Sequence, residues 1–243
     1  MMSFVEMTRG EVIKRQYVYK LKAYKGSYSS LMIIQIIGLL FSFASIISGG
    51  GSGIVGFNYE LNVYSTDFVV GFTLLWAFIT GISIALQHYR YNDFAFVTNR
   101  MTSNFSNVLF LLTSALLGGV TATLIGVSFR LLYSLFNTVE IFAVSYTLSD
   151  LVIGMSASAS YCLCFSAIGY LSGTIIQYHK LFKYLLPIGF IGLLIGFGED
   201  MHPVFSFFFR ETSFLLFFVK IVVTSVLCFV LASCISNRME VRR

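Results

Sequence analysis

Residues 107–129, NVLFLLTSALLGGVTATLIGVSF, decide the fold class of this chain. The stretch is 23 residues long and carries no charged side chain. A helix needs about 20 apolar residues to cross the roughly 30 Å hydrocarbon layer of a bilayer, so the stretch predicts a membrane-spanning helix. In hydrocarbon every backbone donor and acceptor needs a partner within the protein, and an α-helix supplies those partners locally.

The composition of the whole chain agrees with this reading. Hydrophobic residues make up 57% of the 243 residues and charged residues 11%, with only two prolines, whereas soluble domains average about 45–50% apolar and about 25% charged residues. This balance excludes a disordered protein, a nucleic-acid-binding domain and a disulfide-stapled secreted fold. It also argues against a soluble enzyme, because too little polar surface exists to cover so large an apolar core.

Other stretches of similar length complete the predicted membrane domain. They cover residues 30–48, 68–87, 151–178, 181–198 and 212–237, and only Lys183 and Lys220 interrupt them with a charge. We therefore predict an all-α polytopic membrane protein with six transmembrane helices. A basic segment, residues 1–29, precedes the spans, and a short tail, residues 238–243, follows them.

The distribution of cationic residues predicts the orientation. Thirteen of the 16 Lys and Arg residues lie before the first span, after the second, after the fourth and at the C-terminus. By the positive-inside rule both termini then face the cytoplasm of a plasma membrane. One alternative is a seventh span at residues 131–149, which would put the C-terminus outside. We favour two short external helices, or a re-entrant pair, on either side of Glu140.

The N-terminal segment has the pattern of an amphipathic helix. Ile13, Tyr17, Leu21 and Tyr24 recur at helical spacing. Cations occupy the remaining positions, as at Lys14, Arg15, Lys22 and Lys25. A basic amphipathic helix of this kind suits the headgroup plane, where it pairs with anionic lipid.

Small residues mark the predicted helix-packing faces. In lipid, helices associate where small side chains let their backbones approach. The positions that fit this rule are Ser114, Gly118, Ala122 and Gly126 in the third span and Gly192 and Gly196 in the fifth. Such a face either packs within one bundle or forms the seam between two membrane subunits.

A few polar residues within the spans are candidates for a translocation path. They are Gln35 and Ser42 in the first span and Lys220 and Thr224 in the last. Lys220 has a structural alternative, since its side chain could extend to the membrane surface or pair with Glu211 or Glu140. No span carries the series of acids and histidines expected of a proton relay, so a secondary transporter has no visible coupling residue.

Motifs for enzymatic chemistry are absent from the sequence. Residues 51–56, GSGIVG, match a dinucleotide-binding pattern, but they follow a membrane span and not a strand, so we expect a flexible external loop. No GxxxxGK[ST] or HExxH motif occurs. The three histidines lie in three different connections, and the four cysteines lie in apolar runs. We therefore predict no catalytic, cofactor-binding or metal-binding residue in this chain.

The connection after the second span, residues 88–106, is longer than a turn requires. Phe94, Val97, Met101 and Phe105 fall on one helical face, while Asp93 and other polar residues fall elsewhere. The pattern predicts a short amphipathic helix on the cytoplasmic side, either floating at the membrane surface or docked into a soluble partner.

This architecture resembles the permease subunits of type-2 ABC exporters, in particular small permeases of Firmicutes. The most similar part is DFAFVTNR at residues 93–100, just before the third span. The resemblance implies a bacterial chain whose partners are a separate P-loop ATPase subunit, which would hold ATP and Mg, and a second permease subunit. It also implies that the contact with the ATPase involves Asp93, Phe94, Phe96, Asn99, Arg100, Met101 and Phe105.

Two other classes of function stay open on the sequence alone. One is an accessory or immunity membrane protein that binds a peptide or lipid precursor without exporting it. The other is a channel or carrier that works without ATP. For the exporter, a path lined by hydroxyl, amide and aromatic side chains fits a lipid, a peptide or an amphipathic drug.

Overall fold

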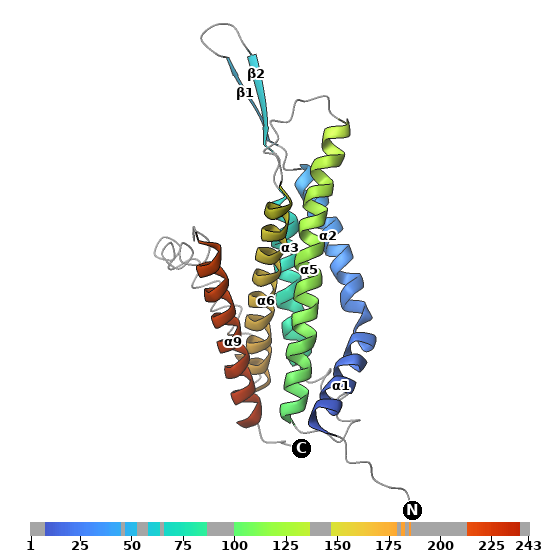
Figure 1. Ribbon diagram of the computed structural model, residues 1–243, viewed down its shortest axis with the longest axis vertical. Coiled ribbons are helices and arrows are strands. Elements are labelled where there is room, and N and C mark those ends of the chain that lie inside the picture. Colours follow the sequence, from blue (N-terminus) through green and yellow to red (C-terminus); the bar gives the residue numbers. More distant parts are fainter. Residues whose placement is uncertain are drawn as a thin grey trace, which may run out of the picture.

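The computed structural model describes residues 8–44, 47–52, 58–63, 66–86, 100–136, 147–178, 181–182, 185 and 213–238. Figure 1 shows these residues as a bundle of helices with a β-hairpin standing away from one end. The helices are α1 (Arg9–Ala23), α2 (Lys25–Ala44), α3 (Asp67–Ala85), α5 (Arg100–Phe136), α6 (Leu148–Tyr178) and α9 (Phe214–Arg238).

Five of these helices, all except α1, are long and apolar enough to cross a membrane. The chain is thus a helical, multi-pass membrane protein, as the sequence predicts. Four of the predicted spans, 68–87, 107–129, 151–178 and 212–237, correspond to α3, α5, α6 and α9. The predicted span at 181–198 lies almost wholly outside the described residues.

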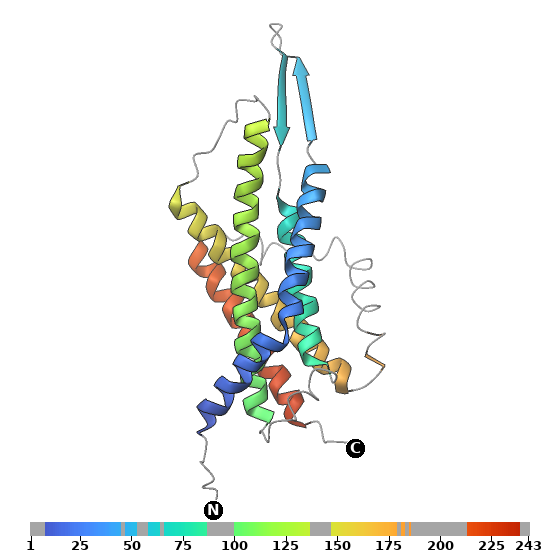
Figure 2. The same cartoon turned by 90° about the vertical axis from the view of Figure 1, so that its right-hand side faces the viewer.

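Helix α1 begins at a capping box and ends at a bend. The backbone N–H of Thr8 donates to Glu11 Oε2 at 3.1 Å, which satisfies one of the free donors at the helix start. Tyr24 separates α1 from α2 with a non-helical backbone, and Figure 2 shows the two helices meeting at an angle. We call the end of the bundle where α1 begins the α1 end.

Neighbouring helices pack as two antiparallel hairpins, α2 with α3 and α5 with α6. Trp76 of α3 bonds to Ser30 near the start of α2, whereas Thr73, one turn earlier on α3, bonds to Gln35 further along α2. The two hairpins lie side by side, with the first helix of one, α2, parallel to the first helix of the other, α5. Gln35 of α2 contacts α5 at Thr121, and Phe43, further along α2, contacts α5 further along at Phe129.

Helices α6 and α9 also run parallel. The rings of Tyr161 and Phe217 lie 4.9 Å apart, and nine residues further along α6 the ring of Tyr170 lies 6.0 Å from that of Phe229. Helix α5 begins at the α1 end, and α6 runs antiparallel to it, so α6 ends at the α1 end. Because α9 is parallel to α6, α9 begins at the opposite end of the bundle (Figure 1).

Helix α5 is longer at both ends than the predicted third span. It has 37 residues, which is about 55 Å at 1.5 Å per residue and well beyond the hydrocarbon thickness. Residues 100–106, expected to belong to a separate amphipathic helix, form its first turns. Residues 131–136, expected in a short external helix or a re-entrant pair, continue it as well. Both expectations were wrong here, because no Gly or Pro interrupts the helix at either place.

The first predicted span is shifted. The sequence predicts residues 30–48, but α2 covers Lys25–Ala44 and residues 47–52 form strand β1. Strand β1 (Ile47–Ser52) pairs antiparallel with β2 (Asn58–Val63), with Ile47 opposite Val63 and Ser52 opposite Asn58. The flexible loop expected at residues 51–56 is therefore wrong for Gly51 and Ser52, which pair in the hairpin. Three consecutive glycines, 49–51, disfavour a longer helix.

Close packing between the helix pairs depends on glycine at particular positions. A Cβ atom at Gly119 of α5 would lie 2.3 Å from the backbone nitrogen of Ala159 in α6. A Cβ atom at Gly81 of α3 would lie 2.3 Å from the carbonyl oxygen of Ser166, also in α6. Both distances are far inside van der Waals contact, so only glycine permits these backbones to meet.

The small-residue stripe predicted on the third span faces the interior of the bundle. Ser114, Gly118, Ala122 and Gly126 are all buried. Gly118 faces the side chains of Trp76, Thr73 and Cys162, with the nearest atom 3.3 Å from a Cβ placed there. Since this face is covered within the chain, it is not available as a seam between two subunits. Gly192 and Gly196 lie outside the described residues.

Candidate functional site

A buried lysine joins α1 to α5 near the α1 end. Lys20 is 1% exposed, although a lysine is almost never buried without compensating bonds. Its Nζ donates to Ser106 Oγ at 2.7 Å and to Asn107 Oδ1 at 2.5 Å. It lies 3.5 Å from the carbonyl oxygen of Ser103, a third acceptor. Three acceptors match the three N–H donors of an ammonium group.

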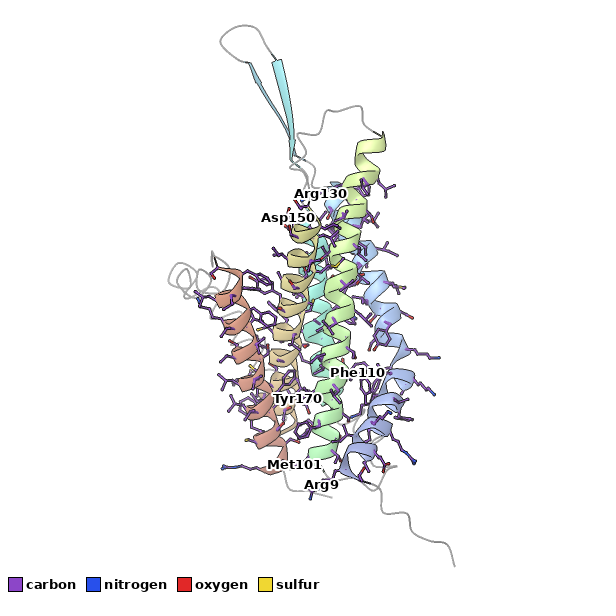
Figure 3. All side chains as sticks on the ribbon, in the orientation of Figure 1. Arg9, Met101, Phe110, Arg130, Asp150 and Tyr170 are labelled. Atoms are coloured by element: carbon purple, nitrogen blue, oxygen red, sulfur yellow. The ribbon has the colours of Figure 1, made fainter. Side chains whose placement is uncertain are left out.

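The same network continues from α5 to α6. Asn107 Nδ2 donates to the hydroxyl of Tyr170 at 3.2 Å, and that hydroxyl donates to Asn104 Oδ1 at 3.1 Å. Figure 3 shows Tyr170 near the level of Phe110, below the middle of the bundle. We call this network the Lys20 cluster; its side chains are Lys20, Asn104, Ser106, Asn107 and Tyr170.

An apolar layer lies next to the Lys20 cluster and limits access of water to it. The rings of Tyr24 and Phe110 meet edge to face, 5.5 Å apart. Tyr170 belongs to the same buried apolar cluster, which also contains Phe229 and Ala232 of α9. Polar bonds in such surroundings are stronger than in water, and breaking one is correspondingly more costly.

Two amides near the α1 end are buried without a full set of hydrogen bonds. Among the described residues, neither the nitrogen nor the oxygen of the Gln16 carboxamide has a partner, and Asn104 Nδ2 also has none. Gln16 is one helical turn from Lys20, on the same face of α1, and is 1% exposed. A buried donor or acceptor without a partner costs about 1–3 kcal/mol.

A second polar contact lies deeper in the bundle and joins α2, α3 and α5. Gln35, a candidate for the translocation path, is buried. Its Nε2 donates to Thr121 Oγ1 at 2.9 Å and lies 3.3 Å from Thr73 Oγ1. The hydroxyl of Ser42 donates to the carbonyl of Gly38 within its own helix. In the described bundle Gln35 thus connects helices.

The other predicted intramembrane residues lie together on α9. Lys220 is partly buried, and its carbonyl accepts a bond from Thr224 Oγ1 at 2.7 Å. Glu211 and Glu140, the acids predicted as alternatives for pairing with Lys220, lie outside the described residues.

The residues expected to contact an ATPase are only partly within the described chain. Asp93, Phe94, Phe96 and Asn99 lie outside it, and Arg100 is the first residue of α5. Met101 and Phe105 are 54% and 58% exposed, and Figure 3 places Met101 at the α1 end. The start of α5 thus presents two large apolar side chains outward and the polar residues of the Lys20 cluster inward.

A cavity of about 210 Å³ lies between the first turns of α2 and the second half of α3. Ser27, Ser30, Trp76 and Thr80 are among the residues that line it. The indole N–H of Trp76 is already bonded to Ser27 O at 3.1 Å and to Ser30 Oγ at 3.0 Å. Small-molecule sites typically measure about 300–1,000 Å³, so this cavity is smaller than usual.

Sequence reasoning missed the Lys20 cluster. From the sequence, Lys20 was only one of the N-terminal cations, Asn104 was only part of a sequon match on the cytoplasmic side, and Asn107 and Tyr170 were assigned no role. One signal was available: Gln16 and Lys20 precede Tyr24 of the apolar stripe at intervals of four residues, which puts all three on one helical face. In the structure these three are buried, while Ile13, Tyr17 and Leu21 of the predicted stripe are half-buried.

No group of three or more His, Cys, Asp or Glu side chains among the described residues could hold a metal ion. The cysteines at 162, 164, 228 and 234 are free thiols. Comparison of the chain with models of protein families finds no match, and comparisons with curated proteins and with solved structures find none either.

Replacing Tyr170 by Phe is expected to weaken the Lys20 cluster. The change removes the acceptor for Asn107 Nδ2 and the donor for Asn104 Oδ1, so we expect a loss of about 1–2 kcal/mol of stability. Thermal unfolding of the purified chain in detergent measures it. Tyr17→Phe is the matched control, since Tyr17 is half-buried on α1 and its hydroxyl takes no part in the Lys20 cluster. Equal melting temperatures for the two variants would contradict a stabilising role for the cluster.

Proposed function

We propose that this chain is the membrane-spanning permease subunit of an ABC exporter in a bacterial plasma membrane, driven by a separate P-loop ATPase subunit. The observation that carries the proposal is the start of α5. Met101 and Phe105 face outward there, while Ser106 and Asn107 are tied inward to α1 through Lys20. A displacement applied to this segment would be transmitted to the bundle through bonded side chains.

The direction of the helices supports a six-span subunit. Helix α6 ends at the α1 end, and α9 begins at the opposite end (Figure 1). This arrangement of the two helix ends is the one that the span predicted at 181–198 requires. Six crossings return both termini to one side, and the clustering of cationic residues makes this the cytoplasmic side.

The proposed source of energy is ATP hydrolysed on the partner subunit. The chain has no GxxxxGK[ST] motif, so ATP and Mg would be held by the partner subunit and this chain would bind no cofactor itself. A second permease subunit would complete the path. Arg9, Lys14, Arg15, Lys22 and Lys25 are exposed on α1 and at the start of α2. These cations suit anionic lipid headgroups.

The proposed orientation gives a direct prediction. Reporter fusions at Gly51 and Asp200 should be external, and fusions at Asn92 and after Arg243 cytoplasmic, because the cationic connections stay on the inside. Paired alkaline phosphatase and fluorescent protein fusions at the four positions measure this. An external C-terminus would mean an odd number of crossings and would exclude the six-span subunit.

The function itself is tested by purification of the tagged chain from the cell that makes it. A permease subunit should bring down a P-loop ATPase in stoichiometric amount, and ATP-dependent export should be lost when either gene is deleted. If the intact chain purifies with no such ATPase, the exporter is excluded. An accessory protein that binds a peptide or lipid precursor then becomes the better proposal.

A further inference from the structure

The face of α1 that carries Lys20 toward α5 has two buried polar side chains, Gln16 and Lys20, which favour different positions of the helix. Lys20 makes three hydrogen bonds across the contact, so it favours the docked position of α1. Gln16, one turn away on the same face, has a carboxamide that makes no hydrogen bond within the described part of the chain. Water would satisfy that carboxamide, so Gln16 favours a position in which α1 has moved off α5.

The connection of α1 to the rest of the chain suits such a movement. Tyr24 is the single non-helical residue between α1 and α2, and its ring is anchored against Phe110 in the apolar layer. Gln16 lies two turns out from this anchor and Lys20 only one turn, so a rotation about Tyr24 displaces Gln16 further than Lys20. Four cations on α1, at positions 9, 14, 15 and 22, are already exposed, so they lose no contact with water when the helix lifts.

We propose that α1 is a latch on the start of α5, held closed by Lys20 and biased toward opening by Gln16. Opening turns Gln16 and Lys20 toward water and uncovers the polar first turns of α5, residues 102–107. The inference depends only on the contact between α1 and α5 and not on the proposed exporter function. It predicts opposite effects for the two neighbouring side chains, whereas a purely structural contact would be weakened by loss of either.

The latch can be followed by the reactivity of one thiol in the full-length chain. Ser103 is 9% exposed, and its carbonyl faces Lys20. Ser103→Cys, in a chain whose four native cysteines are replaced by Ala, is placed in liposomes of phosphatidylglycerol and phosphatidylethanolamine. The rate of its reaction with a water-soluble maleimide then reports how often α1 lifts.

We expect Gln16→Met to slow this reaction at least about fivefold, because Met fills the same space without an unbonded carboxamide. We expect Lys20→Met to speed it at least about fivefold, because the bonds to Ser106 and Asn107 are lost. Lys14→Met and Lys22→Met are matched controls. Each removes one exposed cation from the same helix, and each should react at the rate of the unsubstituted reporter chain.

A second reporter separates a latch from general loosening of the bundle. A chain that retains only Cys162, which is 1% exposed on α6, should react equally slowly with Lys20 or Met at position 20. Acceleration at Cys162 as well would overturn the latch and make Lys20 a support of the whole bundle. A Gln16→Met rate equal to or above that of the reporter chain would also overturn it, and this variant decides the matter should Lys20→Met fail to fold.

Discussion

Gly119→Leu should abolish the folded bundle. Even a methyl group at this position would lie 2.3 Å from the backbone nitrogen of Ala159 and 2.4 Å from its Cα atom. Backbone atoms cannot move aside as the end of a side chain can, so α5 and α6 would have to separate. Overpacking commonly costs about 1–3 kcal/mol, and we expect Gly119→Leu to exceed this range. No monodisperse species should survive gel filtration in mild detergent.

A glycine in open surroundings provides the control. Gly71 of α3 has no atom within 4 Å of a Cβ placed there and is exposed. Gly71→Leu introduces the same side chain into a membrane helix, and it should leave gel filtration and thermal stability unchanged or slightly improved. If Gly119→Leu elutes and melts like Gly71→Leu, the close approach of α5 and α6 at Ala159 is not a feature of the native bundle.

Met101→Ala combined with Phe105→Ala is expected to release the ATPase from the proposed complex. Both side chains are more than half exposed at the start of α5, and in the proposed function they belong to the surface that meets the ATPase. Truncation of a buried interface anchor commonly costs about 2 kcal/mol or more, which is roughly a 30-fold loss of affinity. Co-purification with the tagged chain should therefore fall to a few per cent, while the amount of permease in the membrane stays the same.

Leu109 and Leu112 supply the matched control on the same helix. They are 41% and 39% exposed and lie within the predicted third span, where lipid covers exposed side chains. Leu109→Ala with Leu112→Ala removes similar apolar area without touching the proposed contact, and the ATPase should stay bound. Equal loss in both double variants would mean that the start of α5 is no specific docking surface. The same double substitution at Phe94 and Phe96 extends the test to the preceding segment.

Much of the helical fold could be predicted from the length of the charge-free runs. The predicted spans 68–87 and 151–178 agree closely with α3 and α6. Each of these apolar runs is bounded directly on both sides by a charged or polar residue. The prediction was less accurate where the helix does not end at the same residue as the apolar run. Helix α5 continues through the polar residues 100–106 because helix propensity there is interrupted by no Gly or Pro. Pairing of residues 47–52 with 58–63 depends on a non-local contact that hydropathy does not report.

The candidate site was much less accessible to sequence reasoning. Hydropathy and the positive-inside rule both treat Lys20 as one cation among several near the N-terminus. The burial of Lys20 depends on which face of α1 meets α5. It also depends on Ser106 and Asn107 of α5 lying opposite Lys20, where they accept its hydrogen bonds. Helical periodicity shows which residues share a face, but it does not show which neighbour covers that face. The choice between a lipid-facing and a protein-facing stripe on α1 was therefore beyond the sequence.

The β-hairpin has a practical consequence for imaging this protein. A 27.2 kDa chain with five helices long and apolar enough to cross a membrane offers few features outside a detergent micelle by which single particles can be aligned. The strands pair with each other over six residues each, and they stand clear of the helices in both views (Figures 1 and 2). A rigid tag or nanobody epitope inserted between Ser52 and Asn58 would project from the micelle without entering the helix contacts. It would serve as an alignment marker at the end opposite the proposed ATPase.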